Sequence, residues 1–253
     1  MGVYWLEQTE ADVPKQNDWL SARELIFLDR LRFAPRRADW RLGRWTAKQT
    51  VAACSKLDSS SPALAQIEII PAPSGAPEVF LDNKLSVVTI SLSHRNHRAI
   101  CALGRGAFAL GCDLELIEPR TDAFLSDYFA AEEQALVAGQ PATDRPQLLA
   151  LLWSAKESAL KALRCGLRLD TLSVIVGLVD WSSDVNGWRP LKVRYTGGQT
   201  FCGWWQVADN MVQTVVAFPP PGQPISLALQ RDGGRLAGFS RPTCETEITQ
   251  TCP

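Results

Sequence analysis

Two short stretches of the chain carry acidic and basic side chains at spacings that could support phosphate chemistry. On a helix, Trp153, Glu157 and Lys161 recur every four residues and therefore lie along one face. About forty residues upstream, the period-two alternation of a strand turns Asp113 and Glu115 to one side. Mg²⁺ acting on a phosphate ester prefers a few carboxylates, with positions left for water and substrate oxygen. The pattern therefore predicts magnesium-dependent phosphate chemistry.

Each of these signals also has an ordinary structural interpretation. Asp113 and Glu115 could mark the solvated face of a strand. Glu157 and Lys161 could form a helix-surface ion pair, which contributes only about 0.3–0.5 kcal/mol. His94 ends a Ser-Leu-Ser-His turn and is one of only two histidines, so neither a catalytic triad nor a histidine-rich metal site is expected. The functional interpretation depends on the combination of these elements.

Composition and charge limit the class of protein. The 253 residues are 46% hydrophobic and 21% charged, with a formal net charge of −1. A globular protein has this composition, and the near-neutral charge argues against a nucleic-acid binder. The acidic start of the chain differs from a signal peptide, and no segment has the length of a membrane span. Seven cysteines without a C-x-x-C pair predict reduced thiols, and we expect a soluble cytoplasmic protein.

The patterns along the chain predict an α+β fold. Helical periodicity is expected in three segments: residues 22–56, which are unusually basic, 124–137, and 147–163 with Gly166 as the stop. Strand signals occupy residues 64–70, 87–92, 97–103, 107–117, 172–178, 191–195, 203–207 and 212–218. We expect the strands between 87 and 117 to form an antiparallel meander whose third strand carries Asp113 and Glu115.

The order of these elements predicts three parts of the chain. Helix precedes sheet in each half, which indicates two similar lobes with a cleft between them. We expect an N-terminal lobe at residues 1–104, a C-terminal lobe at 105–222 and a loosely packed tail at 223–253. The tail is rich in Gly, Pro, Thr and Arg and has little apolar periodicity.

The combination of motifs resembles a known family. The segment Gly111-Cys112-Asp113-Leu114-Glu115 matches G-[VIC]-D-[LIV]-E, and the segment from Trp153 to Lys161 matches W-x-x-K-E-[SA]-x-x-K. These are signatures of 4′-phosphopantetheinyl transferases of the surfactin-synthetase-activating (Sfp) type. The basic stretch from Pro35 to Arg44 and the Ser-His turn also match, so the resemblance covers about residues 22–178.

What the resemblance implies is a two-lobed, cytoplasmic monomer with coenzyme A and Mg²⁺ in its cleft. Such an enzyme transfers the 4′-phosphopantetheine arm of coenzyme A to a serine of an apo acyl or peptidyl carrier protein. Adenosine 3′,5′-bisphosphate is the other product. The carrier would serve fatty-acid, polyketide or non-ribosomal peptide assembly and would dock through its acidic helix.

The resemblance also implies a role for each matching residue. Asp113, Glu115 and Glu157 would hold Mg²⁺. Coenzyme A would be bound by basic and polar residues from three segments: Arg36, Arg41, Arg44, Ser93, His94, Lys156 and Lys161. Glu133 stands in a segment like the family's F-x-x-x-E and would accept the proton of the carrier serine. Its neighbour Glu132 and a metal-bound water are alternative bases.

Two departures from the family pattern affect the expected coenzyme A contacts. Gly75-Ala76-Pro77 stands where many relatives have a Gly-basic-Pro segment, so one phosphate contact is expected to be missing or moved to Lys84 or Arg95. Arg95-Asn96-His97 is bulky and basic where small residues usually follow the Ser-His pair. Two other functions stay open: a non-catalytic paralogue that binds coenzyme A or carrier proteins, and a magnesium-dependent phosphohydrolase or nuclease.

Overall fold

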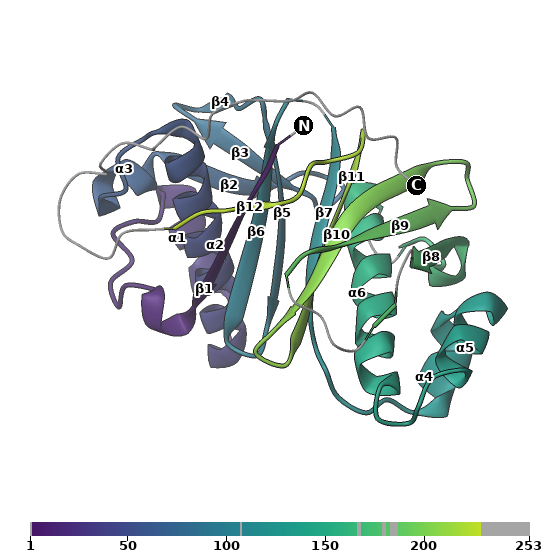
Figure 1. Ribbon diagram of the computed structural model, residues 1–253. Helices are drawn as coiled ribbons and strands as arrows, with labels where there is room; N and C mark the ends of the chain where they lie inside the picture. The colour runs from purple at the N-terminus through teal and green to yellow at the C-terminus, as the bar shows by residue number, and fades with distance from the viewer. Residues whose placement is uncertain (1, 107, 166–167, 179–180, 183–186, 229–253) are drawn as a thin grey trace.

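Figure 1 shows the computed structural model, which describes residues 2–106, 108–165, 168–178, 181–182 and 187–228. The expected α+β class is confirmed. The helices are α1 (Ala22–Arg30), α2 (Ala34–Ser55), α3 (Ser61–Ala65), α4 (Asp122–Tyr128), α5 (Ala131–Ala138) and α6 (Arg145–Ala162). The strands are β1 (Val3–Thr9), β2 (Ile67–Pro71), β3 (Pro77–Leu81), β4 (Lys84–Leu85), β5 (Val88–Arg95), β6 (Arg98–Arg105), β7 (Ala109–Leu116), β8 (Val174–Leu178), β9 (Arg189–Tyr195), β10 (Thr200–Ala208), β11 (Met211–Phe218) and β12 (Ile225–Ser226).

The described strands form three sheets, with orders β12-β1-β6-β5, β7-β11-β10-β9-β8 and β2-β3-β4. The predicted meander is therefore wrong at its third strand. β5 and β6 form the expected antiparallel hairpin, but β7 leaves that sheet and pairs with β11. The free edge of β6 is taken instead by β1, an N-terminal strand that the sequence patterns did not predict.

The end of the described chain returns to the first sheet. β12 pairs in parallel with β1, and Leu227 is buried beside it. This pairing differs from the loose packing expected for residues 223–253, because backbone hydrogen bonding ties the start of that segment to an edge strand. Residues 229–253 lie outside the described part of the chain.

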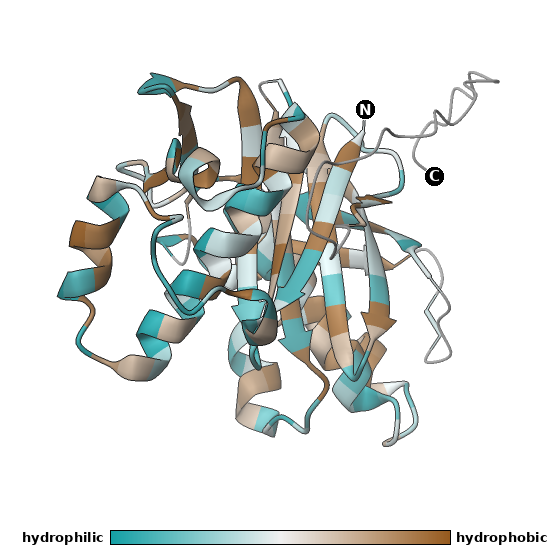
Figure 2. Ribbon diagram, turned by 90° about the vertical axis from the view of Figure 1, so that its left-hand side faces the viewer, coloured by the Kyte–Doolittle hydropathy of each residue, from teal (hydrophilic) through white to brown (hydrophobic). Residues whose placement is uncertain are grey.

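The faces of the central strands are divided between three hydrophobic clusters. Odd and even positions of one strand face different clusters, as the pleat requires; in β6, Ile100 and Cys101 illustrate this. One cluster joins β1 and β6 to β7 and β11, so the two larger sheets pack against each other. α2 packs against the other face of the first sheet and α6 against that of the second. Hydrophobic and hydrophilic bands alternate along these strands in Figure 2.

Two segments that we expected to be single helices are each divided. Residues 22–56 form α1 and α2, because Pro35 can occupy only the first turn of a helix and disfavours helical backbone before it. Residues 124–137 form α4 and α5, since the backbone is extended at Phe129, whose ring is buried in the core. The expected helix stop at Gly166 lies outside the described residues.

Two further expectations concern cysteines and the membrane. Cys54, Cys101, Cys112 and Cys165 are free thiols, whereas Cys202 takes part in a disulfide bond. The prediction that every cysteine is reduced is therefore wrong at Cys202. In the part of the chain that the structure describes, no helix has the length and apolar character needed to cross a membrane.

Gly111 permits a close approach between α6 and β7. A Cβ atom at this position would lie 1.7 Å from the carbonyl oxygen of Ser158 in α6. We therefore expect Gly111→Ala to force the helix from the sheet and to lower the free energy of unfolding by about 1–3 kcal/mol, measured by urea denaturation.

Gly43→Ala is the matched control, because a Cβ at Gly43 has no neighbour within 4 Å. Gly43 lies inside α2, where alanine is favoured by about 0.5–1 kcal/mol. Equal stability of the Gly111→Ala variant and the natural protein would contradict the proposed packing constraint.

Candidate active site

Asp113 lies where β5, β7 and α6 meet, and it is only 4% exposed. Its Oδ1 accepts hydrogen bonds from Ser93 Oγ in β5 and from Lys161 Nζ in α6, both at 2.7 Å. Lys161 Nζ also donates to the carbonyl oxygen of Cys112 at 3.1 Å. Asp113 Oδ2 is buried and has no hydrogen-bond partner among the described residues. One oxygen of this carboxylate is thus held by the protein, and the other keeps a hydrogen-bonding capacity that no described residue uses.

Glu115 follows Asp113 on the same face of β7. Burial, then repulsion from Asp113, raises the pKa of Glu115 to about 7, although Arg95 and Arg120 oppose the shift. Arg120 Nη2 lies 3.3 Å from Glu115 Oε2 and 3.0 Å from Glu118 Oε1. Arg95 Nη2 lies 3.1 Å from the same Glu118 oxygen. Two arginines therefore share two carboxylates next to Asp113.

Glu157 and Lys161 approach Asp113 from α6. Burial, then repulsion from Asp113, raises the pKa of Glu157, and Lys161 opposes this shift. Burial by itself would lower the pKa of Lys161, but Asp113 and Cys112 outweigh it and the net pKa is raised. Lys161 is therefore a stable ammonium group. Trp153, one turn before Glu157, packs edge to face against Phe124 with ring centroids 5.2 Å apart and so fixes the rotation of α6.

A divalent cation fits the donor set. Asp113 Oδ2 has no hydrogen-bond partner among the described residues, and the pKa values of Glu115 and Glu157 are raised, first by burial and then by repulsion from Asp113. A bound cation would stabilise the charged form of all three carboxylates. Carboxylate oxygens of this kind are the ligands that Mg²⁺ prefers. Within the described ranges, however, no three His, Cys, Asp or Glu side chains are grouped as a formed metal site. The carboxylates are close enough for Asp113 to raise the pKa values of Glu115 and Glu157, but their oxygens do not already surround one point as metal ligands do.

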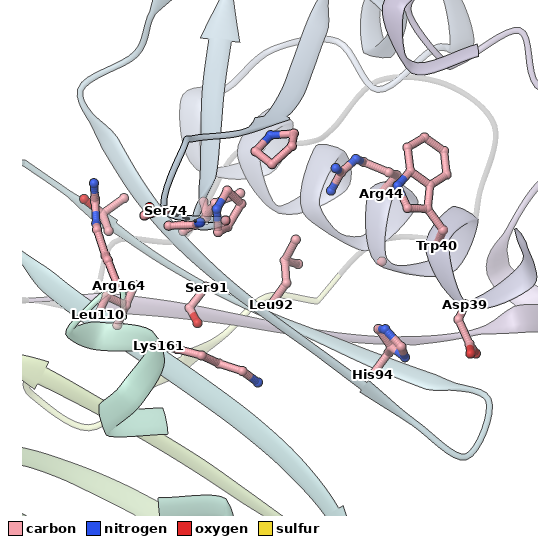
Figure 3. Close-up of a pocket in the computed structure, with 17 residues that line it drawn as sticks. Asp39, Trp40, Arg44, Ser74, Ser91, Leu92, His94, Leu110, Lys161 and Arg164 are labelled. Carbon is pink, nitrogen blue, oxygen red and sulfur yellow. Dashed lines mark hydrogen bonds between the residues drawn. The ribbon is translucent and has the colours of Figure 1, made fainter. Parts of the chain in front are cut away.

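A pocket of about 430 Å³ opens beside these residues, between α2 and the end of α6 (Figure 3). Three of the predicted site residues line it: Arg44, His94 and Lys161. Gly75, Ala76 and Pro77, where the sequence suggested a missing phosphate contact, also line it. The remaining lining residues were not predicted individually as site residues: Asp39, Trp40, Gly43, Pro71, Ser74, Thr89, Ile90, Ser91, Leu92, Leu110 and Arg164. Lys161 connects the pocket to Asp113, because it lines the first and hydrogen-bonds the second.

His94 stands at the rim of this pocket, close to Asp39 in Figure 3. Partial burial of the ring is the main effect on His94 and lowers its pKa, although the residue keeps exposed surface. Lys161 also lowers this pKa, whereas Asp39 and Asp113 raise it. The net direction is downward, so the imidazole is neutral at neutral pH. A neutral imidazole can both donate and accept a hydrogen bond at the mouth of the pocket.

Arg44 reaches the pocket from α2, with its guanidinium 4.9 Å from the centroid of the Trp40 ring. Arg41, predicted to bind the same ligand, instead ties α2 to the N-terminal loop by donating to Asn17 Oδ1 at 2.9 Å and to the carbonyl oxygen of Pro14. Arg36 is exposed, and neither it nor Arg41 is among the described residues that line the pocket.

The structure contradicts the roles expected for Glu133 and Lys156. Glu133 is 1% and Lys156 0% exposed, and their charged groups lie 2.7 Å apart in the core. Glu133 also accepts the backbone N–H groups of Ala130 and Val176, at 2.9 and 3.0 Å. A carboxylate that is shielded from solvent and occupied in this way is a structural ion pair and cannot serve as the base for an external serine. Neither residue is among the described lining of the pocket.

The first half of the chain contains an equivalent ion pair that sequence reasoning missed. Lys48 of α2 is fully buried and lies against Glu24 of α1. Lys48 Nζ donates to the carbonyls of Trp19 and Leu64, at 2.9 and 3.0 Å, just as Lys156 donates to two backbone carbonyls. Glu24 and Glu133 each occupy the third position of a helix and accept the backbone N–H of its N-cap residue. The S-x-x-E cap at Ser21 was the available sequence signal.

The site lies on strands and a helix whose sequence matches a family of phosphate-transferring enzymes. Residues 109–218 match the model of the 4′-phosphopantetheinyl transferase superfamily. This span runs from β7 to β11 and therefore includes Asp113, Glu115, Glu157 and Lys161. No curated protein matches the chain.

The raised pKa of Glu115 predicts a pH-dependent stability in the metal-free protein. A carboxylate whose folded pKa lies near 7 rather than near 4.5 contributes stability at low pH that is lost as the pH rises between those values. We expect Glu115→Gln to remove about 2–3 kcal/mol of that loss between pH 5 and pH 8. Urea denaturation in EDTA at both pH values measures it. Parallel pH profiles for the two proteins would contradict the assignment.

The buried pair Glu133–Lys156 predicts a strong effect on stability. Glu133→Gln or Lys156→Met leaves one buried charge without its partner, so each should lower the free energy of unfolding by about 3–5 kcal/mol. The double variant should be less destabilised than the sum of the two. Glu132→Gln is the control, because Glu132 and Arg194 form an exposed pair and should contribute less than about 1 kcal/mol. Additive effects in a thermal or urea double-mutant cycle would show that the two groups are not coupled.

Proposed function

We propose that this protein is a magnesium-dependent 4′-phosphopantetheinyl transferase of the Sfp type. It would move the phosphopantetheine arm of coenzyme A to a serine of an apo acyl or peptidyl carrier protein. The observation that carries this proposal is the buried Oδ2 of Asp113, which lacks a hydrogen-bond partner, beside Lys161, which lines a pocket with basic side chains. The match of residues 109–218 to the superfamily supports it.

The pocket has the charge that coenzyme A requires. Its basic lining includes Arg44 and Lys161, which suit an anionic nucleotide. Leu92 and the edge of the lining at Trp40, whose ring stacks on Phe27 and holds the Arg44 guanidinium, add apolar surface. His94 supplies a neutral hydrogen-bonding group at the rim. Ser93, in contrast, is held by Asp113 and would act by positioning that carboxylate rather than by contacting coenzyme A.

In the proposed reaction, Asp113, Glu115 and Glu157 would hold Mg²⁺, which neutralises charge on the diphosphate when it is bound. Lys161 would donate a charged hydrogen bond to a phosphate oxygen near Asp113. The serine oxygen bonds to the phosphorus next to the pantetheine arm, and the bond from that phosphorus to the bridging oxygen breaks. Adenosine 3′,5′-bisphosphate leaves with the bridging oxygen.

Glu157 is the group that we assign to accept the serine proton, through the carboxylate oxygen that does not hold the metal. Burial and repulsion from Asp113 raise its pKa, so this carboxylate binds a proton more readily than an ordinary glutamate does. This assignment replaces Glu133, whose carboxylate is enclosed in the core.

Two similar lobes with the site between them are part of the same proposal. The repeated buried pairs Glu24–Lys48 and Glu133–Lys156 support this arrangement, because each ties a capped short helix to the following long helix and to a strand. The pocket residues come from both halves of the chain.

Intact-protein mass spectrometry of an apo carrier protein, incubated with this protein, coenzyme A and Mg²⁺, tests the proposal. We expect the carrier to gain one phosphopantetheine arm, and EDTA to abolish the gain. Asp113→Asn should reduce transfer at least about 100-fold because it removes a ligand charge from the site. Asp209→Asn is the matched control, since Asp209 is exposed and pairs with Arg98, and it should retain full activity.

The same experiment separates the alternatives. Phosphate released from coenzyme A without a carrier would indicate a phosphohydrolase. Coenzyme A binding without any transfer would indicate a non-catalytic paralogue. Full transfer by Asp113→Asn would refute the assignment of the metal site.

A further inference from the structure

α6 ends in a left-handed turn at Arg164, a position that normally takes glycine. Arg164 has φ 56°. Its backbone N–H bonds to the carbonyl oxygen of Lys161 at 3.0 Å, and that of Cys165 bonds to Leu160 at 3.4 Å. These two bonds close the helix in the manner of a Schellman motif. Arginine is strained in this conformation because of its Cβ atom, so the residue costs stability that glycine would not.

The side chain of Arg164 lies at the pocket beside the loop of Ser74 (Figure 3). Arg168, four residues further on, donates to the carbonyl oxygen of Ser74 at 3.1 Å and holds the loop against the end of α6. Arg164 itself has no side-chain hydrogen bond or ion pair among the described residues. Its guanidinium is therefore free to bind a ligand that enters between α6 and the loop.

The other cationic groups of the pocket each lie near an acidic side chain. Lys161 is paired with Asp113 at 2.7 Å, and Arg44 lies 3.9 Å from the buried Glu24, which also pairs with Lys48. His94 is neutral at neutral pH because its pKa is lowered. Among the described lining residues, Arg164 is thus the cation with no acidic side chain within ion-pair distance, and an anionic ligand would offset its charge.

We propose that Arg164 and the loop of Ser74 to Pro77 form a phosphate-binding subsite for coenzyme A. A guanidinium group can bind two phosphate oxygens at once, which gives strong and directional contacts. The inference rests on the proposed function. It also supplies the phosphate contact that a basic residue would make in place of Ala76. Neither Lys84 nor Arg95 is among the described lining residues, whereas Arg164 lines the pocket together with Ala76. Arg95 is occupied by Glu118.

Arg164→Gly separates binding from folding, because glycine removes both the cation and the backbone strain. Lys56→Gly is the matched control. Lys56 ends α2 in the same left-handed conformation, with φ 55°, but it is exposed and is not among the described pocket residues. Both variants should be at least as stable as the natural protein in thermal denaturation. Only Arg164→Gly should bind coenzyme A more weakly.

Calorimetric titration of coenzyme A, without Mg²⁺ or carrier, measures the binding. We expect Arg164→Gly to weaken the affinity roughly tenfold or more, Arg164→Lys to recover part of it, and Lys56→Gly to leave it unchanged. Unchanged affinity in Arg164→Gly would overturn the subsite while leaving the proposed transferase intact. No binding of coenzyme A by the natural protein would instead refute the proposed function, and the subsite with it.

Titration with dephospho-coenzyme A, which lacks the 3′-phosphate, extends the test. If Arg164→Gly weakens both ligands equally, Arg164 contacts the diphosphate. If it weakens coenzyme A alone, Arg164 contacts the 3′-phosphate. An equal loss of coenzyme A affinity in Arg164→Gly and Lys56→Gly would show that the relaxed helix ends, rather than the lost cation, cause the effect, and would overturn the proposal.

Discussion

The contact between Lys161 of α6 and Asp113 of β7 is the interaction on which the candidate site depends. It requires α6 to lie unusually close to the strand, and Gly111 permits this because its missing Cβ leaves room for the carbonyl of Ser158. The same approach lets Lys161 bond one oxygen of Asp113, whereas the other oxygen is buried without a hydrogen-bond partner among the described residues. The small size of Gly111 thus sets the distance between Lys161 and Asp113. Any change that moves α6 away from β7 also separates this ion pair.

Buried Glu–Lys pairs hold the two halves of the chain in shape. Each lysine bonds to two backbone carbonyls, and each glutamate bonds to the N-cap of a short helix and to a strand. An isolated buried charge is costly, whereas a pair with all its hydrogen bonds made can be accommodated. The pairs therefore specify one arrangement of helix and strand, while neighbouring residues on the same helices serve the pocket. On α6, Lys156 faces the core and Lys161 faces the site, because they lie on different faces.

The basic residues of the pocket differ in how far burial and acidic neighbours reduce their positive charge. Lys161 and Arg44 have acidic neighbours, His94 is neutral, and Arg164 projects from a strained helix end. Glu115 and Glu157 hold protons more tightly than free carboxylates do. This balance suits a ligand that carries several negative charges and a cation that neutralises the carboxylates. A highly acidic or basic whole protein is not needed, since the charge that matters is local.

The sequence by itself determined the α+β class, the alternation that turns Asp113 towards α6, and the register that places Glu157 and Lys161 one turn apart. These features follow from periodicity, which is a property of neighbouring residues. Only the tertiary structure decided that β7 joins β11 rather than β6, because strand pairing depends on which distant segment occupies each edge. Only it showed that Glu133 and Lys156 are enclosed in the core, since a sequence motif does not reveal burial. The position of Arg164 at the pocket was also decided by the tertiary structure. It depends on how the end of α6 meets the loop of Ser74, a contact between residues about ninety positions apart.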